Sequence, residues 1–576
     1  MGRLFQRHET RRTFCLDGLW NICFDENNVG TEEKWYENFP AHGETACVPG
    51  CWQTSFDCFH KNGTVWYQKE FVTSSEHIQL IFEGVNNECD VYIDGKHILY
   101  HYGGFTEFSQ VVTGLGAGRH SMVLRVTNSH NDVDTIPLTY TDWLPFGGII
   151  RSIEVQELGD LYIRDVKIDY DLNVAEKSAI LQVAVRPENL SGTADCKTAA
   201  HGRLCVYMED KLLAAKEITA AVPGETKIVF SDLCLEQIAL WGIFQPNLYT
   251  VRITWEQEGI CLDDLAERIG FRSIQALGKD ILLNGEKIIL KGINRHEQHP
   301  EWGFSMPEHL IKKDIDIIRD MGCNAVRGAH YPHNKWTLDY LDSVGILFWE
   351  EIPMWGFQGP AMESQLVLER SKEMMKEMIL RDYHHPCIVF WGLFNEIDTR
   401  IPASRIICST LAQTVKELDD KYRLTSYATM YDCDDICFDL VDVISLNKYY
   451  GWFINGEPLE HWEVFLEKFK NFLKEKDLFH KPFIMSEYGA GAIYGERQAE
   501  EVKWTENFQA KYIAYTTDLF MNDPDICGTF PWQFCDCRTG GALTMNRPRG
   551  YNNKGLVNEY RKPKLAYEEL KRRYTK

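Results

Sequence analysis

The chain has 576 residues, 44% of them hydrophobic and 25% charged, which is enough for about three or four domains with large cores. Its formal net charge of −23 argues against binding to nucleic acid or to anionic membranes, because like charges repel. The 18 cysteines include no Cys-x-x-Cys pair and no Cys/His cluster with zinc spacing, so they predict buried free thiols rather than metal ligands.

The first region, residues 1–159, reads as short strands separated by turns. Alternating apolar and polar residues mark strands at 78–85, 90–95 and 121–127, and no segment has a clear helical period. Closely spaced turn residues between such strands are typical of an antiparallel β-sandwich.

The second region, residues 160–274, keeps the β character in a smaller unit. Strands are predicted at 178–185, 203–208 and 249–255. A β-rich unit of this size favours an immunoglobulin-like sandwich.

The third region, residues 275–576, alternates strands with amphipathic segments such as 309–321, 368–383 and 405–422. Eight strands separated by helices predict a (β/α)8 barrel. The predicted strands are 288–294, 324–328, 346–351, 388–396, 424–428, 443–447, 483–487 and 528–532.

Polar residues gather where these barrel strands end. The carboxyl ends of the strands meet at one mouth of a barrel, where active sites lie. One polar strand end is usually structural, but several converging on one mouth predict a functional site. The residues concerned include Asn294, His296, Arg327, His330, Glu350, Glu351, Asn395, Glu396, Asn447, Tyr449, Glu487 and Trp532.

Glu396 and Glu487 follow strands on opposite sides of that mouth. Retaining glycoside hydrolysis requires two carboxyl groups about 5 Å apart, one as nucleophile and one as acid/base. Asn395 is placed to donate a hydrogen bond to a sugar 2-hydroxyl, a contact that strengthens in the transition state. The competing interpretation is that each glutamate is a structural ion-pair partner.

Four segments resemble signatures of glycoside hydrolase family 2, and the resemblance covers essentially the whole chain. They are Gly-Ile-Asn-Arg-His-Glu at 292–297, Asn-Ala-Val-Arg-Gly-Ala-His-Tyr-Pro at 324–332, Trp-Gly-Leu-Phe-Asn-Glu at 391–396 and Ile-Met-Ser-Glu-Tyr-Gly at 484–489. The resemblance implies a jelly-roll β-sandwich, an immunoglobulin-like sandwich and a TIM barrel, with Glu396 as acid/base and Glu487 as nucleophile. Gly328 and Ala329 depart from the usual small residue and serine, which leaves the packing around His330 open.

A second resemblance, to the β-glucuronidase branch, concerns the sugar. Asn552 and Lys554 match its Asn-x-Lys motif, and the resemblance implies that they bind the C6 carboxylate of the sugar. Asp142 matches a residue in a sandwich loop that reaches the sugar. A turn aspartate is the alternative for Asp142. Phe453 stands where relatives often carry tyrosine. Arg547 and Arg549 lie near this motif and could assist in binding the carboxylate, but the simpler interpretation is that both are surface residues.

Other side chains complete the predicted substrate site. Tyr449 is expected to hydrogen-bond Glu487, with a core tyrosine as the alternative, and Trp532 is expected to form a wall beneath the pyranose or to plug the barrel. His296 and His330 are expected to contact substrate. The connection after Trp355 is short and lacks the long active-site loop of some bacterial relatives, which predicts an open mouth that accepts large aglycones.

The sequence therefore predicts a retaining β-glucuronidase that acts on glucuronide conjugates or glucuronic-acid-ended oligosaccharides. A β-galacturonidase or β-galactosidase on the same scaffold is the alternative, and a non-catalytic carbohydrate-binding protein is a remote one. We expect no metal or organic cofactor in catalysis. A homo-oligomer, dimer or tetramer, is expected from the resemblance. No apolar signal core and no run of 18 apolar residues appears, which predicts a cytoplasmic location.

Overall fold

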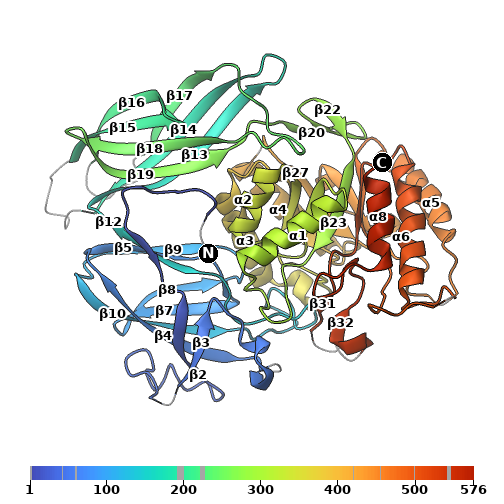
Figure 1. Ribbon diagram of the computed structural model, residues 1–576, viewed down its shortest axis with the longest axis horizontal. Coiled ribbons are helices and arrows are strands. Elements are labelled where there is room, and N and C mark those ends of the chain that lie inside the picture. The colour runs from blue at the N-terminus through green and yellow to red at the C-terminus, as the bar shows by residue number, and fades with distance from the viewer. Residues whose placement is uncertain are drawn as a thin grey trace.

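Three β-containing units make up the protein, which we describe from a computed structural model (Figure 1). Two β-sandwiches lie beside a closed eight-stranded parallel barrel, so the predicted fold class is confirmed. No helix among the described residues is long and apolar enough to cross a membrane. The structure describes residues 3–41, 43–58, 61–190, 200–220, 227–419, 421–454, 456–498, 500–540 and 546–576.

The first sandwich packs a four-stranded sheet, in the order β1-β12-β5-β9, against a six-stranded sheet, in the order β3-β2-β4-β10-β7-β8. Alternate side chains of these strands are buried between the sheets, which is why the period of two was visible in the sequence. The helical elements in the described part of this unit are two short 3-10 turns, η1 (Trp52–Thr54) and η2 (Phe56–Cys58). The strands are β1 (Thr13–Cys15), β2 (Gly18–Phe24), β3 (Glu44–Val48), β4 (Thr64–Thr73), β5 (His77–Phe82), β6 (Val85–Asn86), β7 (Glu88–Ile93), β8 (Lys96–Tyr102), β9 (Phe108–Val112), β10 (Gly118–Thr127), β11 (Gly148–Ile149) and β12 (Ile153–Leu158).

The second sandwich packs the sheet β13-β14-β17 against the sheet β16-β15-β18-β19. A separate three-stranded sheet, β20-β21-β22, then leads into the barrel, and the sequence did not predict it. The strands are β13 (Leu161–Asn173), β14 (Ser178–Asn189), β15 (Ala200–Met208), β16 (Lys211–Ala220), β17 (Ile228–Leu235), β18 (Tyr249–Gln257), β19 (Ile260–Ile269), β20 (Ile274–Leu277), β21 (Asp280–Leu283) and β22 (Glu286–Ile288).

The barrel closes in sequence order from β23 to β30, and all eight predicted strands are present. These strands are nearly all buried on both faces, as expected when helices cover a parallel sheet. They are β23 (Leu290–Arg295), β24 (Ala325–Gly328), β25 (Leu347–Glu351), β26 (Ile388–Asn395), β27 (Leu424–Thr429), β28 (Val443–Asn447), β29 (Phe483–Tyr488) and β30 (Gly528–Pro531).

The helices α1, α3 and α4 coincide with the predicted amphipathic segments. The alternation of strands and helices has one exception. Between β27 and β28 the chain makes two 3-10 turns, η4 (Asp432–Asp434) and η5 (Phe438–Leu440), because this aspartate-rich segment favours turns over a helix. A small sheet, β31 (Cys537–Arg538) with β32 (Tyr551–Asn552), follows the barrel. The remaining elements are α1 (Glu308–Asp320), α2 (Lys335–Val344), η3 (Gly359–Glu363), α3 (Gln365–Asp382), α4 (Pro402–Leu418), α5 (His461–Glu475), α6 (Glu506–Met521), η6 (Pro548–Gly550) and α8 (Leu565–Tyr574).

Arg11 ties the two sandwiches together. Its guanidinium makes two hydrogen bonds of 2.8 Å to Asp263 in β19, one of 2.8 Å to Gln156 in β12 and one of 2.5 Å to the carbonyl of Ile163 in β13. Arg11 and Asp263 are both buried, so each charge depends on the other for compensation.

Replacing Arg11 by alanine should therefore lower stability strongly. The change leaves the Asp263 carboxylate buried without its partner, which costs about 3–5 kcal/mol. The matched control is Arg12→Ala, because Arg12 is 60% exposed in its pair with Glu157 and exposed pairs contribute about 0–1 kcal/mol. Thermal unfolding should give a clearly lower midpoint for Arg11→Ala only; equal midpoints would contradict this account of the junction.

Candidate active site

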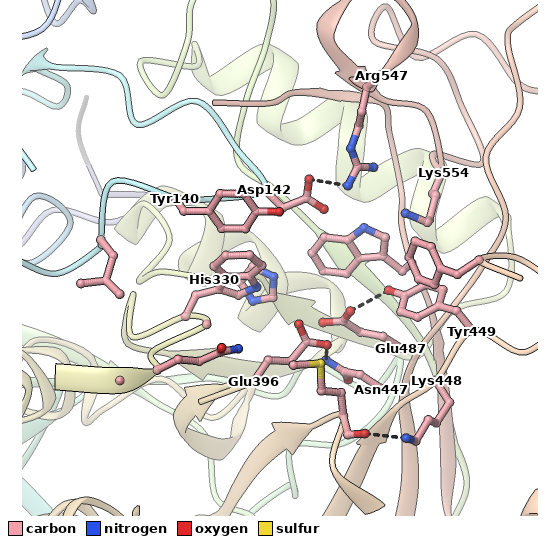
Figure 2. A pocket seen from close by; sticks show the side chains of 18 of the residues that line it. Tyr140, Asp142, His330, Glu396, Asn447, Lys448, Tyr449, Glu487, Arg547 and Lys554 are labelled. Carbon is pink, nitrogen blue, oxygen red and sulfur yellow. Dashed lines mark hydrogen bonds and ion pairs between the residues drawn. The ribbon is translucent and has the colours of Figure 1, made fainter. Parts of the chain in front are cut away.

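A cavity of about 1010 Å³ opens at the carboxyl ends of the barrel strands. Figure 2 shows the carboxyl groups of Glu396 and Glu487 directed into the same part of this cavity, with Tyr449 and Lys554 on one side. Side chains from the first sandwich, including Asp142, complete the wall. The cavity thus unites residues that are up to about 400 positions apart in the sequence.

Glu396 directly follows β26 and has a φ of 52°, an uncommon backbone conformation for a residue with a side chain. Its carboxyl group accepts a 2.9 Å hydrogen bond from Asn447 Nδ2. Burial, and after it the negative charge of Glu487, raise the pKa of Glu396 to about 8, against the opposing effects of Asn447 and Arg327. Glu396 therefore carries a proton at neutral pH.

Glu487 lies in β29 and is held on both oxygens. Arg327 Nη1 donates to Oε1 at 2.8 Å, and the Tyr449 hydroxyl donates to Oε2 at 2.7 Å. The pKa of Glu487 is raised on balance, because burial outweighs the Arg327 charge and these two hydrogen bonds, which act in the opposite direction. Both donors favour the ionised form, which is the form that a nucleophile needs. The predicted contact between Tyr449 and Glu487 is present.

Arg327 links the two halves of the site. Besides Glu487, its guanidinium contacts Asn395 Oδ1 at 2.7 Å and Glu351 at 2.9 Å. Asn447 also donates to Asn395 Oδ1, at 3.1 Å. The Asn395 oxygen is thereby saturated, while its buried Nδ2 has no protein partner in the described ranges. That N–H group therefore has an unmet hydrogen bond directly beside Glu396.

Lys554 brings a positive charge to the cavity. Its side chain is 3% exposed. Nζ makes no hydrogen bond or ion pair with any described residue. It lies 5.3 Å from the centre of the Tyr449 ring. Burial, and after it the charge of Arg547, lower the pKa of Lys554 to about 8, against the attraction of Asp142 and Glu487. An anion bound here would supply the missing partner.

Asp142 reaches the cavity from a loop of the first sandwich. One carboxylate oxygen pairs with Arg547 at 2.7 Å (Figure 2). The other accepts from Asn552 Nδ2 at 2.8 Å. The interpretation of Arg547 as a surface residue was wrong, because the sequence could not reveal that the two domains place Asp142 beside it. Arg549 pairs with Glu559 instead and does not line the cavity.

Trp532 and His330 form another part of the wall, with ring centroids 4.9 Å apart and stacked. His330 Nδ1 lies 2.7 Å from Glu351 Oε1. The glycine at 328 has a clear reason, since a Cβ there would come within 2.4 Å of the Phe348 ring.

Three predicted contacts, His296, Asn395 and Asn552, do not line the cavity. Asn395 and Asn552 contact residues that do, namely Asn447 and Asp142. His296 lies in a different place. It is buried behind Trp532 and His330, at ring distances of 5.3 and 5.4 Å, and its Nδ1 lies 3.2 Å from the Tyr331 hydroxyl. The sequence shows that a polar residue ends a strand, but not in which layer its side chain packs.

Within the described ranges, one group of side chains has the composition of a metal site: Asp342, His385 and Cys387. All three are buried, and hydrogen bonds account for their arrangement. Asp342 contacts His385 Nδ1 at 2.5 Å and accepts from the backbone N–H of Cys387 at 2.9 Å. None of them lines the cavity.

Arg327 and Asn447 were predicted only as polar strand ends without a role of their own, and Arg547 was interpreted as a surface residue. Arg327 and Asn447 stand at strand ends, which was the available signal. Their tasks became visible only from their contacts with Glu487, Asn395 and Glu396.

Comparison with known proteins gives matches along the whole chain. Models of the glycosyl hydrolases family 2 match in order: the sugar binding domain at 14–158, the central domain at 161–272 and the TIM barrel domain at 274–576. A β-glucuronidase of Streptococcus agalactiae is 28% identical over 604 residues, covering 98% of this chain and 96% of that protein.

Solved structures are similar over the same length. A family 2 β-galacturonidase from Eisenbergiella tayi, bound to galacturonate, has a TM-score of 0.90 and 31% identity, covering 100% of this chain and 99% of that one. A β-glucuronidase from Ruminococcus gnavus, in complex with D-glucuronic acid, has a TM-score of 0.87 and 25% identity with the same coverage.

The pKa of Glu396 should respond to the charge of Glu487. Carbon-13 NMR of glutamate side chains should give a pKa of about 8 for Glu396, and Glu487→Gln should lower it because a nearby negative charge is removed. Glu70→Gln removes a carboxylate that is 61% exposed on the first sandwich and is the control. An unchanged pKa in Glu487→Gln would contradict the coupling.

Proposed function

The chain belongs to glycosyl hydrolase family 2, and from that premise we propose that it is a retaining β-glucuronidase. It releases glucuronic acid from glucuronide conjugates or from oligosaccharides that end in this sugar. Glycoside hydrolase activity follows from the family and from its curated relatives. The uronic acid and the retaining mechanism are the parts that we propose here.

One observation carries the choice of an acidic sugar: Lys554, a residue only 3% exposed, lines the cavity, and its Nζ has no anionic hydrogen-bond partner among the described residues. A buried ammonium without a partner is costly, and a C6 carboxylate would compensate it through a charge-assisted hydrogen bond. A neutral galactoside would leave that cost in place. The β-galactosidase alternative is therefore disfavoured.

The two glutamates support a double displacement. The ionised Glu487, oriented by Arg327 and Tyr449, attacks the anomeric carbon, while the protonated Glu396 gives its proton to the departing oxygen. Esterification of Glu487 removes its negative charge, so the pKa of Glu396 falls and Glu396 can accept a proton from water. Asn395 Nδ2 donates to the sugar 2-hydroxyl. Activity should fall as pH rises through about 8, where free Glu396 loses its proton.

β-Galacturonidase activity is the second candidate. The similar galacturonidase structure is 31% identical to this chain, whereas the similar glucuronidase structure is 25% identical. Both sugars carry the carboxylate that Lys554 would bind, and they differ in the orientation of the C4 hydroxyl. Parallel assays with aryl β-glucuronide and aryl β-galacturonide decide between them.

Replacing Lys554 by methionine should abolish most activity on uronides. The loss of a buried charge partner costs about 2–5 kcal/mol, equivalent to roughly 30-fold or more in kcat/KM. Activity on the matching neutral aryl glucoside, however low, should not fall, because that substrate has no carboxylate.

The matched control for Lys554→Met is Arg549→Ala, which removes a cation from the same C-terminal segment but outside the cavity. Its activity on the uronide should stay near that of the wild type. A Lys554→Met variant that still hydrolyses the uronide at the wild-type rate would rule out the proposed carboxylate contact.

The first sugar released should be the β anomer. Two displacements at the anomeric carbon restore its configuration, and proton NMR in the first minutes, before mutarotation, distinguishes the anomers. Glu487→Gln should bind the sugar yet release no aglycone, since the nucleophile is gone. Initial formation of the α anomer would show single displacement and contradict the roles assigned to both glutamates.

A further inference from the structure

The cavity has two chemically different ends. The inner end holds the charged and hydrogen-bonding groups around Glu396, Glu487 and Lys554. The outer end is mainly apolar and aromatic, formed by Leu138, Tyr140, Trp355, Pro360 and Met430. A volume of about 1010 Å³ is at the upper end for drug-sized ligands, so a single sugar leaves space at this outer end.

Tyr140 and Trp355 form the centre of this outer end. Their rings are stacked, with centroids 6.0 Å apart and an interplanar angle of 27°. Tyr140 comes from the first sandwich and is 51% exposed, while Trp355 follows β25 of the barrel. We call this pair the aromatic platform. Because two domains build it, the platform exists only when the sandwich is docked on the barrel.

The loop that carries Tyr140 is anchored on both sides of it. Upstream, Asp134 accepts a 2.8 Å hydrogen bond from Ser364 and, through its carbonyl, one of 2.6 Å from Arg370. Downstream, Trp143 is fully buried, with its ring 5.8 Å from that of Trp355. The Tyr140 ring is therefore presented to the cavity at little entropic cost.

The platform lies on the same side of the cavity as Glu396, the proposed acid/base. The backbone of Gly356 donates to the Asn395 carbonyl at 2.9 Å, and the backbone of Asn395 donates to Met354 at the same distance. Trp355 is thus held beside the residue that precedes Glu396. Since Glu396 protonates the departing oxygen, the group attached to that oxygen extends toward Trp355 and Tyr140.

We propose that the Tyr140–Trp355 platform is the aglycone subsite and selects flat aromatic leaving groups. This inference rests on the proposed function for the direction of the bound sugar. An aromatic aglycone stacks on the exposed Tyr140 ring and buries apolar surface against Leu138 and Met430. A sugar in the same place would bring several hydroxyl groups to a surface formed mainly by apolar and aromatic side chains, with few polar groups such as Asp132, Gln358 and Lys448 to pair with them. The connection between Trp355 and α3 is short, and the Tyr140 ring is 51% exposed.

The test compares Tyr140→Ala with wild type on two glycosides of whichever uronic acid the wild type cleaves. One carries 4-methylumbelliferone and the other a methyl group. Loss of the ring should lower kcat/KM for the methylumbelliferyl glycoside about 5- to 10-fold, while the methyl glycoside changes less than about 2-fold. The effect belongs in kcat/KM, because the aglycone departs in the first chemical step.

The matched control is Tyr140→Phe, which keeps the ring and should retain the preference for the aryl glycoside. A disaccharide with the same terminal sugar gives the third arm. An equal loss on aryl and methyl glycosides, no loss on either, or a larger loss on the disaccharide than on the aryl glycoside would each overturn the inference. The proposed function fails separately, if the wild type cleaves neither glucuronides nor galacturonides.

Discussion

The contacts of the buried Arg327 guanidinium are the interaction on which the arrangement of the cavity's side chains depends. The guanidinium contacts Glu487, Glu351 and Asn395 at once, at 2.7 to 2.9 Å, and these residues come from three different barrel strands. An arginine suits this position because its planar fork can satisfy several acceptors in fixed directions. Without Arg327, the buried carboxyl groups of Glu351 and Glu487 would have no compensating charge between them. The Asn395 side-chain oxygen would also lose a hydrogen bond that fixes the orientation of its amide.

The cavity concentrates ionisable groups whose preferred states differ. Burial raises the pKa values of Glu396 and Glu487, but Glu487 receives two donors that favour its charge, whereas Glu396 also feels that negative charge. Lys554 shows the same effect with opposite sign, since burial lowers its pKa to about 8. The cavity therefore combines a carboxyl group that favours its protonated form, an oriented carboxylate and a cation without an anionic partner among the described residues, the combination on which the proposed function rests.

The first sandwich contributes chemistry as well as stability. Its loop supplies Asp142, which holds Asn552 and Arg547, and Tyr140, which pairs with Trp355. The barrel alone would present the two glutamates but would lack one wall of the cavity. Docking of the first sandwich on the barrel is thus coupled to the shape of the cavity, while Arg11 and its partners fix the same sandwich to the second one.

The sequence by itself was sufficient for the fold and for the placement of Glu396 and Glu487 in one cavity. Periods of two and 3.6 residues, and buried strands ending in polar residues, predicted both sandwiches, all eight barrel strands and the position of Glu396 and Glu487 at one mouth. It missed the sheet β20-β21-β22 and the turns between β27 and β28, whose short segments have too little periodicity to be recognised.

Only the tertiary structure decided which side chains meet. Arg547 belongs to the cavity because Asp142, about 400 residues earlier, lies beside it, and His296 is in the layer behind the wall because Trp532 and His330 occupy the wall itself. Local patterns record the environment of each residue along its own strand or loop. Contacts between distant segments depend on how strands and domains pack, and the periodicity of one segment carries no information about the side chains of another.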